Sequence, residues 1–441
     1  MIWWQVLTVI LIGLFFLMIF RVPIAFAFLL VNIVAAYFIW GEEEGLDLLI
    51  SSMGSSLINF SLLPIPLFIL MGEIMFQSGT APRMINTVDK WFGNVPGRLS
   101  MLAVGSGALL STLTASNMAS TAMLGSTLIP EMENKKYNKT MAIGPILGSG
   151  ALAAMIPPSA LGILLASMGQ VSVGKFLIAI ILPGILMAVL YMVYIIIRAV
   201  TNPHLAPAYK QSKVPLKEKI MDTLKYITPL GLLFVLVLGF IFLGIATPTE
   251  AAAMGALGSM ILSACYKQLT LDVLVKSLSG TLKITVMILL IISASAAFSQ
   301  ILSFSGATRG LVGIIQDINT VPLVVLILML FTVIILGTFL ESLSIMMLIV
   351  PVFFPIANAL DFDLLWFSVL ILLAIEVGTI SPPFGTGLFA MKGVVSRDTT
   401  MMTIYSSAIP FIFLLIALIL LVLFVPSIVT WLPGMMDTSF H

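Results

Sequence analysis

Long apolar stretches follow one another along this chain, and each is about as long as a membrane-spanning helix. Such a helix needs about 20 mostly apolar residues to cross a bilayer. Stretches of that kind occupy residues 3–20, 22–40, 57–78, 141–170, 176–198, 228–245, 250–266, 284–303, 364–391 and 401–424. The pattern predicts an all-α polytopic membrane protein.

Two further apolar regions, at about 100–130 and 322–358, are each interrupted by a polar run, at 111–121 and at 337–342. Half of such a region reaches only about 22 Å into a hydrocarbon core about 30 Å thick, so neither fits one span or two. The first region has basic flanks on both sides and the second has mainly acidic flanks. The positive-inside rule then predicts two re-entrant hairpins, the first entering from the cytoplasm and the second from outside.

Prolines recur at a fixed distance in the two halves of the chain. At an offset of 225 residues the matched pairs are Pro23 with Pro248, Pro130 with Pro355, and Pro157-Pro158 with Pro382-Pro383. Chance gives about 0.6 matches at one offset for this many prolines, so the matches indicate an internal repeat. An odd number of spans separates equivalent helices. The repeats are therefore expected to be inverted, an architecture associated with alternating access.

Charge and repeat together predict the organisation of the chain. Each repeat is expected to hold about five transmembrane helices plus one re-entrant hairpin. The predicted parts are a first inverted repeat at 1–200, a cytoplasmic linker at 201–227, a second inverted repeat at 228–425 and a C-terminal tail at 426–441. The linker is basic, and its residues 216–227 are expected to form an amphipathic helix at the membrane surface.

Composition agrees with a lipid environment. Of the 441 residues, 60% are hydrophobic and 9% are charged, whereas a soluble domain carries about 25% charged residues. The net charge of +1 gives no electrostatic basis for binding nucleic acid. Cys265 is the one cysteine, and His204 and His441 lie in a predicted loop and tail. We expect no nucleic-acid partner, no disulfide and no enzyme, since an intramembrane enzyme needs a catalytic or metal-binding constellation within its spans.

One motif is similar to the start of a nucleotide-binding loop, Gly169-Gln-Val-Ser-Val-Gly-Lys175. Phe176 stands where such a loop needs Ser or Thr, and no strand precedes it. We therefore expect transport that uses no nucleotide.

Broken backbone within the spans is where we expect the chemistry. The breaks are the two polar tips, Ile156-Pro-Pro-Ser159, and the run from Gly378 to Gly387. Proline frees a carbonyl group and glycine permits close approach, so oxygen ligands for Na⁺ become available. Half-helix N-termini suit a carboxylate. Glycine and proline also kink packed spans that bind nothing, but four breaks matched in pairs by the repeat favour a site.

Two polar residues stand out at the tips. Glu341 lies at the second tip with no neutralising neighbour in the sequence, and we expect an intramembrane carboxylate of this kind to be functional. Asn117 lies in the first tip, where its amide needs partners at membrane depth.

Three other carboxylates have simpler interpretations. Glu376, just before the Gly378 break, suits a ligand site and a packing role equally well. Glu73 is expected to bond a neighbouring helix. Glu250 is expected to close a capping box with Thr247 at the start of a span.

The chain resembles, over essentially its whole length, the large membrane subunit of the tripartite ATP-independent periplasmic (TRAP) transporters. The motifs that carry the resemblance are PIPLFILMGE at 64–73, IPEM at 129–132, IPPS at 156–159, ATPTE at 246–250 and GTISPPFG at 378–385. The resemblance implies sodium-coupled uptake of a small organic acid by an elevator-type mechanism in the bacterial inner membrane. It also implies a separate small four-helix membrane subunit and a periplasmic binding protein that delivers the substrate. Most members of the family move carboxylates, and some move zwitterions such as ectoine.

The resemblance also implies site residues. One sodium site is expected to include Ser116, Asn117, Gly148 and Pro157, and the other Gly337, Gly378, Thr379 and Ser381. The substrate is expected between the tips, near Asn117, Ser120, Glu341 and Thr386.

Two alternatives remain at this point. A stand-alone sodium–dicarboxylate symporter would share the hairpins but need no binding protein. A channel would need a continuous polar path, whereas hairpins entering from opposite faces favour alternate closure.

Overall fold

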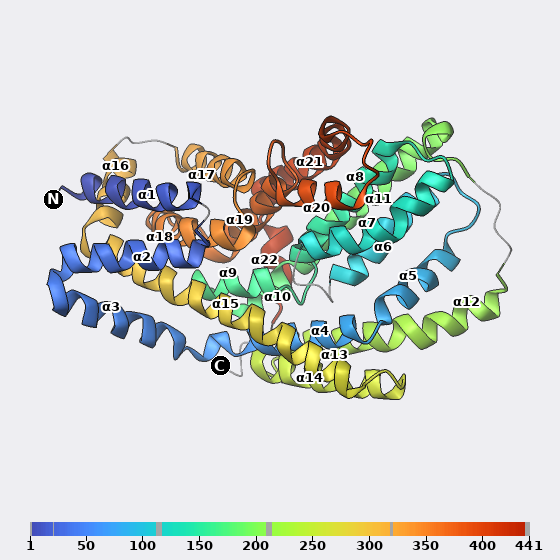
Figure 1. Ribbon diagram of the computed structural model, residues 1–441, viewed down its shortest axis with the longest axis horizontal. Coiled ribbons are helices and arrows are strands. Elements are labelled where there is room, and N and C mark those ends of the chain that lie inside the picture. The colour runs from blue at the N-terminus through green and yellow to red at the C-terminus, as the bar shows by residue number, and fades with distance from the viewer. Residues whose placement is uncertain (1, 21, 112–116, 209–213, 318–320, 437–441) are drawn as a thin grey trace.

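Every regular element in the described part of the chain is helical, as Figure 1 shows for the computed structural model. The structure describes residues 2–20, 22–111, 117–208, 214–317 and 321–436. The fold class predicted from the hydrophobic pattern is therefore confirmed as all-α.

The described residues of the first half of the chain and the linker form twelve α-helices. They are α1 (Trp3–Ile19), α2 (Ile24–Ala36), α3 (Glu42–Leu57), α4 (Pro64–Gln77), α5 (Thr80–Trp91), α6 (Arg98–Ser111), α7 (Asn117–Asn134), α8 (Lys139–Met155), α9 (Ala160–Met168), α10 (Val173–Ala179), α11 (Ile181–Thr201) and α12 (Leu216–Asp222).

Ten α-helices follow in the part of the second half that the structure describes. They are α13 (Thr228–Phe242), α14 (Pro248–Cys265), α15 (Leu271–Phe304), α16 (Ala307–Asp317), α17 (Pro322–Gly337), α18 (Ser342–Ala359), α19 (Leu364–Thr379), α20 (Thr386–Val394), α21 (Met401–Phe424) and α22 (Ser427–Gly434).

The outer surface of the described helices is strongly apolar. Seven helical stretches are long and apolar enough to cross a membrane, and α8 with α9 passes the same test as a pair bent by 46°. On α1, Val9 is 62% exposed and Ile12 63% exposed, which a soluble protein would not repeat along whole helices. The molecule is a multi-pass membrane protein.

The breaks predicted from proline and glycine lie where the sequence places them. The helix of the fourth apolar stretch ends at Met155 and resumes at Ala160, and that of the ninth ends at Thr379 and resumes at Thr386. Both polar tips also separate pairs of helices, α6 from α7 and α17 from α18. The capping box is confirmed, because the Thr247 backbone N–H donates to Glu250 Oε2 over 2.8 Å.

The acidic run after the second apolar stretch begins a helix. Glu42, Glu43 and Glu44 form the first turn of α3, where carboxylates are favoured by the partial positive charge of a helix N-terminus. The reversal of direction occurs at Gly41, whose φ of 104° suits glycine. Helix α3 then extends the chain well beyond the predicted span.

Four short helices were not predicted by the apolar pattern, namely α3, α5, α16 and α22. Helices α5 and α16 are amphipathic, so they contain no long apolar run for a span search to find. Helix α22 lies in the segment predicted as a C-terminal tail, and its Val429 is fully buried. The predicted amphipathic helix at 216–227 is present as α12 continued by a π-helical segment, Thr223–Ile227.

Ion pairs connect α5 with α6 and with α12. Arg98, at the start of α6, is buried and donates two hydrogen bonds to the Asp89 carboxylate of α5, at 2.9 and 2.7 Å. Lys90 of α5 pairs with Asp222 and Glu218 of α12. The hydrogen bond to Asp222, and then that to Glu218, raises the pKa of the Lys90 ammonium. The predicted membrane-surface helix α12 is thus tied to α5.

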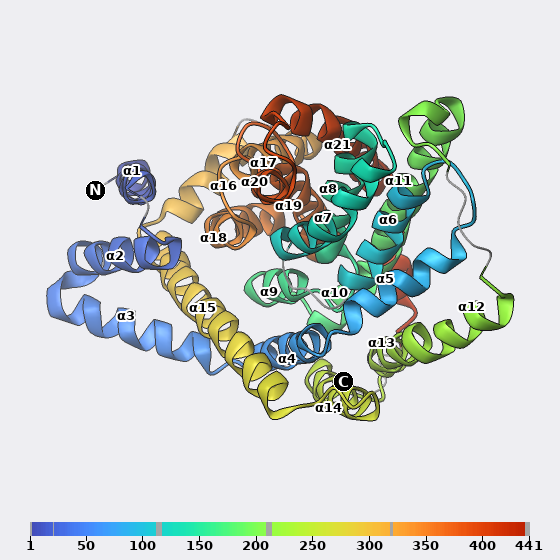
Figure 2. The same ribbon diagram turned by 45° about the vertical axis from the view of Figure 1, so that its right-hand side comes forward.

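The helices form two groups that meet at the centre of the molecule (Figure 2). Helices α3, α4, α13, α14 and α15 run along one side, and α7, α8 and α17 to α21 lie together on the other. At the centre of the second group, α8 and α19 are almost wholly buried and pack on α21. The inverted repeat and its domain limits stay predictions, although α6 to α9 and α17 to α20 follow the same order of hairpin and broken helix.

Candidate functional site

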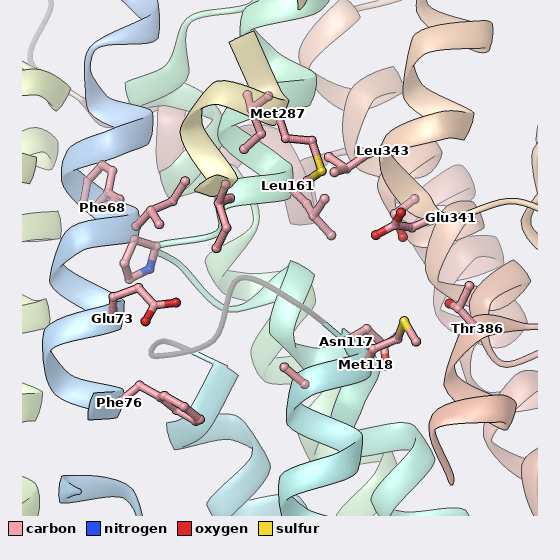
Figure 3. Close-up of a pocket in the computed structure, with 18 residues that line it drawn as sticks. Phe68, Glu73, Phe76, Asn117, Met118, Leu161, Met287, Glu341, Leu343 and Thr386 are labelled. Atoms are coloured by element: carbon pink, nitrogen blue, oxygen red, sulfur yellow. The ribbon is translucent and has the colours of Figure 1, made fainter. Parts of the chain in front are cut away.

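Four helices begin around one cavity of about 350 Å³ (Figure 3). The cavity is lined by the first residues of α7, α9, α18 and α20, which are Asn117, Ala160, Ser342 and Thr386. The unpaired backbone N–H groups of a helix N-terminus give it a partial positive charge of about half a unit. Broken and hairpin helices therefore place four such ends around a single space.

The opposite wall of the cavity comes from α4 and α15. Phe68, Glu73 and Phe76 of α4 face the space, with Ile284 and Met287 of α15 beside them. Glu73 accepts a hydrogen bond from Gln77 Nε2 of its own helix at 3.2 Å. A Cβ at Gly280 of α15 would lie 2.9 Å from the Glu73 carboxyl carbon. The expected bond from Glu73 to a neighbouring helix is absent among the described residues, and its carboxylate instead lines the cavity.

Asn117 is held by a network beneath the cavity. Its Nδ2 donates to Glu376 Oε2 and to Thr379 Oγ1, both over 3.0 Å, and Thr121 Oγ1 donates to its Oδ1 over 3.2 Å. The side chain is only 6% exposed. The amide thus joins the start of α7 to the last turn of α19. Its two partners there, Glu376 and Thr379, lie 259 and 262 positions away in the sequence.

Glu376 belongs to the same cluster, although the sequence left its role open between a ligand site and packing. The residue is fully buried, and its Oε1 has no hydrogen-bond partner among the described residues. Buried carboxyl oxygens are nearly always paired, so an unpaired one is a candidate ligand atom. The signal in the sequence was a glutamate half a turn before the Gly378 break.

Ser120 lies in the same region but does not line the cavity. It is fully buried, and its hydroxyl has no hydrogen-bond partner within the described part of the chain. Its oxygen therefore faces the protein interior and not the cavity. Ser116 lies outside the described residues.

Gly148 and Pro157, which were both predicted for the first sodium site, lie in different surroundings. Gly148 faces packing, because a Cβ there would lie 2.5 Å from the Phe411 ring. Gly150, two residues on, is the glycine that faces the network: a Cβ there would lie 2.4 Å from Asn117 Oδ1. Pro157 is buried, and the adjacent Pro158 lines the cavity.

At the second tip the backbones of two helices touch. A Cβ at Gly337 would lie 2.7 Å from the Cα of Gly378, and one at Gly378 would lie 2.5 Å from the Cα of Gly337. The structure therefore brings together α17 and α19 at the pair of glycines expected to flank the second sodium site.

Carbonyl oxygens gather at the α19–α20 break. A Cβ at Gly385 would lie 2.5 Å from the carbonyl oxygen of Thr379 and 2.8 Å from that of Ser381. Thr379 and Ser381 are both buried, and each hydroxyl donates to a carbonyl of α19. These are the hard oxygen donors that suit a small alkali cation.

Glu341 stands exposed in the cavity as the N-cap residue of α18. Its side chain makes no capping hydrogen bond. Figure 3 shows Glu341 on the side of the cavity opposite Glu73, with Thr386 close below it. Of the four predicted substrate residues, the structure thus gathers Asn117, Glu341 and Thr386 around one space.

A second cavity of about 690 Å³ lies at the other end of α18. Residues Val350 to Asn358 of that helix line it, whereas Ser342 and Leu343 line the first cavity. Its polar lining carries no charged side chain and consists of Ser56, Asn59, Ser167, Gln170, Ser295, Ser299, Gln300 and Asn358. One helix thus borders two separate spaces.

Comparison with known proteins now identifies the family. The model of the tripartite ATP-independent periplasmic transporter, DctM component, matches residues 11–428. The chain belongs to the DctM family. This match confirms the resemblance that the proline- and glycine-containing motifs indicated.

Individual relatives of the DctM family agree. The C4-dicarboxylate TRAP transporter large permease protein DctM of Pseudomonas aeruginosa is 30% identical over 384 residues, covering 86% of this chain and 88% of that protein. The sialic acid TRAP transporter large permease protein SiaM of Vibrio cholerae is 29% identical, covering 93% and 94%. The relatives are transport permeases rather than enzymes, and this chain is the large permease of a TRAP transporter for organic acid uptake.

A solved structure shares the fold. The YdaH transporter of Alcanivorax borkumensis matches with a TM-score of 0.64 and 14% identity, covering 89% of this chain and 90% of that one. At this identity the likeness concerns the fold alone.

Proposed function

We propose that this permease carries a small organic acid across the bacterial inner membrane together with sodium ions, after a periplasmic binding protein has delivered the substrate. A separate small four-helix membrane subunit is its expected partner. The moving part is the group of helices around α7, α8, α18 and α19, which shifts like an elevator past α4 and α15.

The convergence of four helix N-termini on one cavity carries the proposal. A carboxylate placed there meets partial positive charge from α7, α9 and α20, and none of these helices has an acidic residue in its first turn. In a site with little water, each such end stabilises an anion by up to about 2 kcal/mol. Among the described residues that line the cavity there is no lysine, arginine or histidine, so the helix ends are the positive charge that these residues offer a carboxylate.

Buried oxygen atoms beside the cavity support sodium coupling. The first group is Asn117 Oδ1, the unpaired Glu376 Oε1 and the unpaired Ser120 hydroxyl. The second is the pair of carbonyls near Gly385. Na⁺ prefers several hard oxygen ligands, and unwound backbone at a helix break supplies them in known transporters. Each group includes the start of a helix that borders the cavity, α7 for the first and α20 for the second, so bound ions would fix those ends in place for the substrate.

The two cavities support alternating access. They lie at opposite ends of α18, and the loop charges predict that the larger one opens to the outside. A shift of α18 relative to α15 would enlarge one space while reducing the other, because both helices line both cavities.

Uptake into proteoliposomes tests the proposal. The full chain is reconstituted with its small subunit, radiolabelled organic acids are supplied with or without candidate binding proteins, and the driving gradient is sodium or protons alone. We expect uptake only with a sodium gradient and a binding protein. Equal uptake in sodium-free buffer with a proton gradient contradicts sodium coupling. Uptake of free dicarboxylate by the permease without a binding protein supports the stand-alone symporter instead.

A further inference from the structure

The charged side chains of the cavity are all of one sign. Of the lining residues that the structure describes, Glu73 and Glu341 alone carry charge, and both are acidic. Figure 3 shows the two glutamates on opposite sides of the space.

This charge pattern is unsuited to a dianion. One carboxylate of a ligand can lie against the helix N-termini of α7, α9 and α20, but four ends of about half a charge each are already partly offset by Glu341 at the start of α18. A second carboxylate would have to lie near Glu341, near Glu73 or against apolar wall. Each of these positions is unfavourable in a space of low dielectric constant.

The remainder of the lining favours a cation. Phe68 and Phe76 lie on α4 to either side of Glu73, and Met118, Leu161 and Leu343 close the space around Glu341. Aromatic faces beside a carboxylate form the environment in which ammonium groups bind, since the ring quadrupole and the carboxylate attract the same charge.

We propose that the substrate is a small organic acid that also bears a positively charged nitrogen, a zwitterion rather than a dicarboxylate. Its carboxylate lies at the N-termini of α7 and α20, near Asn117 and Thr386. Its cationic nitrogen lies at Glu341, with Glu73 and the α4 phenylalanines facing it across the cavity. This inference rests on the proposed function, because it specifies the substrate class of the same cavity.

Binding of probes matched in size and different in charge tests the inference. The full chain in lipid nanodiscs, with its small subunit, is studied by saturation-transfer NMR in sodium buffer. The probes are succinate as dianion, butyrate as monoanion, and 4-aminobutyrate, glycine betaine and ectoine as zwitterions. We expect saturation transfer to at least one zwitterion and at least about tenfold weaker binding of succinate.

Variants then locate the charge that is recognised. Glu341→Gln is expected to weaken zwitterion binding about tenfold and to leave butyrate binding as tight as in wild type or tighter, because the cationic group loses its partner while the anion loses a repulsive charge. Glu131→Gln is the matched control, since Glu131 is exposed at the far end of α7 and does not line the cavity. It is expected to bind all probes as the wild type does.

Three results overturn the inference: binding of succinate as tight as that of any zwitterion, binding of no zwitterion at all, or zwitterion binding unchanged by Glu341→Gln. The sodium dependence of binding distinguishes a failure of this inference from a failure of the proposed function. Sodium-dependent binding of succinate would leave the proposed function standing and refute the zwitterion. Zwitterion binding that is equal in sodium and in choline buffer would refute sodium coupling and leave the substrate class intact.

Discussion

The two hairpin tips place their most distinctive polar residues in opposite environments. Asn117, at the first tip, is 6% exposed and has three hydrogen bonds to side chains of α7 and α19. Glu341, at the second tip, is exposed to the cavity and makes no capping bond. The first tip is thus attached to the α19 break by a side chain, and its amide is largely committed to the interior.

The second tip is joined to the same helix by backbone. Gly337 and Gly378 let α17 and α19 approach until their main chains are in contact, so no side chain is needed at the crossing. Glu341 therefore stays available to a ligand. The difference teaches that the two tips need not share a role: one is held in the protein interior by hydrogen bonds, and the other presents a charge to the cavity.

The two hairpins are expected to differ most in how they react with a thiol reagent added to one side of the membrane. On a background carrying Cys265→Ser, we expect Asn358→Cys to react with an impermeant thiol reagent added outside, and Glu133→Cys to react only after permeabilisation. Both residues are exposed at the open end of their hairpin. The physical reason is the basic flank of the first hairpin and the acidic flank of the second. Equal labelling of both cysteines from outside would refute hairpins that enter from opposite faces.

Asn117→Ala is expected to reduce uptake about 100-fold or more, because it removes two donated hydrogen bonds and leaves Glu376 and Thr379 buried without them, a change of about 3 kcal/mol. The same variant should lower the melting temperature. Asn134→Ala is the control: it lies on the same helix, is exposed, and should behave as wild type. Uptake of Asn117→Ala within twofold of wild type, with an unchanged sodium requirement, would show that the first tip has no part in transport.

Gly378→Ala is expected to destabilise the protein by about 1–3 kcal/mol, because its Cβ would meet the Gly337 backbone, which cannot rotate away as a side chain can. Denaturation in detergent by light scattering or tryptophan fluorescence measures this. Gly239→Ala on α13 is the control, since a Cβ there meets nothing within 4 Å. A Gly378→Ala variant as stable as Gly239→Ala would mean that the helices do not cross by backbone contact.

Glu341→Gln is expected to have the smallest structural effect and a selective functional one. Uptake should fall about tenfold, and the free energy of unfolding should change by less than about 0.5 kcal/mol, because the side chain is exposed and makes no capping bond. Uptake and thermal unfolding measured on one preparation check both parts. A variant that loses stability in proportion to uptake would place Glu341 among the structural residues, with Asn117.

Local features of the fold were predictable because each depends on neighbours in the sequence. A run of apolar residues, a proline pair that removes backbone donors and a Thr-Pro-Thr-Glu capping box act within one or two helical turns. They determined the spans, the breaks after Met155 and Thr379, and the start of α14. The amphipathic helices α5 and α16 were not predicted from apolar runs, because half of each helix faces away from lipid or protein and carries polar residues.

The sequence by itself also determined which residue types lie at the tips, but tertiary structure decided what each one does. Gly148 and Gly150 are equally good helix-packing glycines in the sequence. Only the packing of α7 and α21 on α8 places Gly150 beside Asn117 and Gly148 beside Phe411. Glu376 acquires its amide partner from a residue 259 positions away. No local pattern specifies such a contact, because it depends on how two distant helix ends meet, and at that meeting burial and hydrogen bonding outweigh the preference of either segment alone.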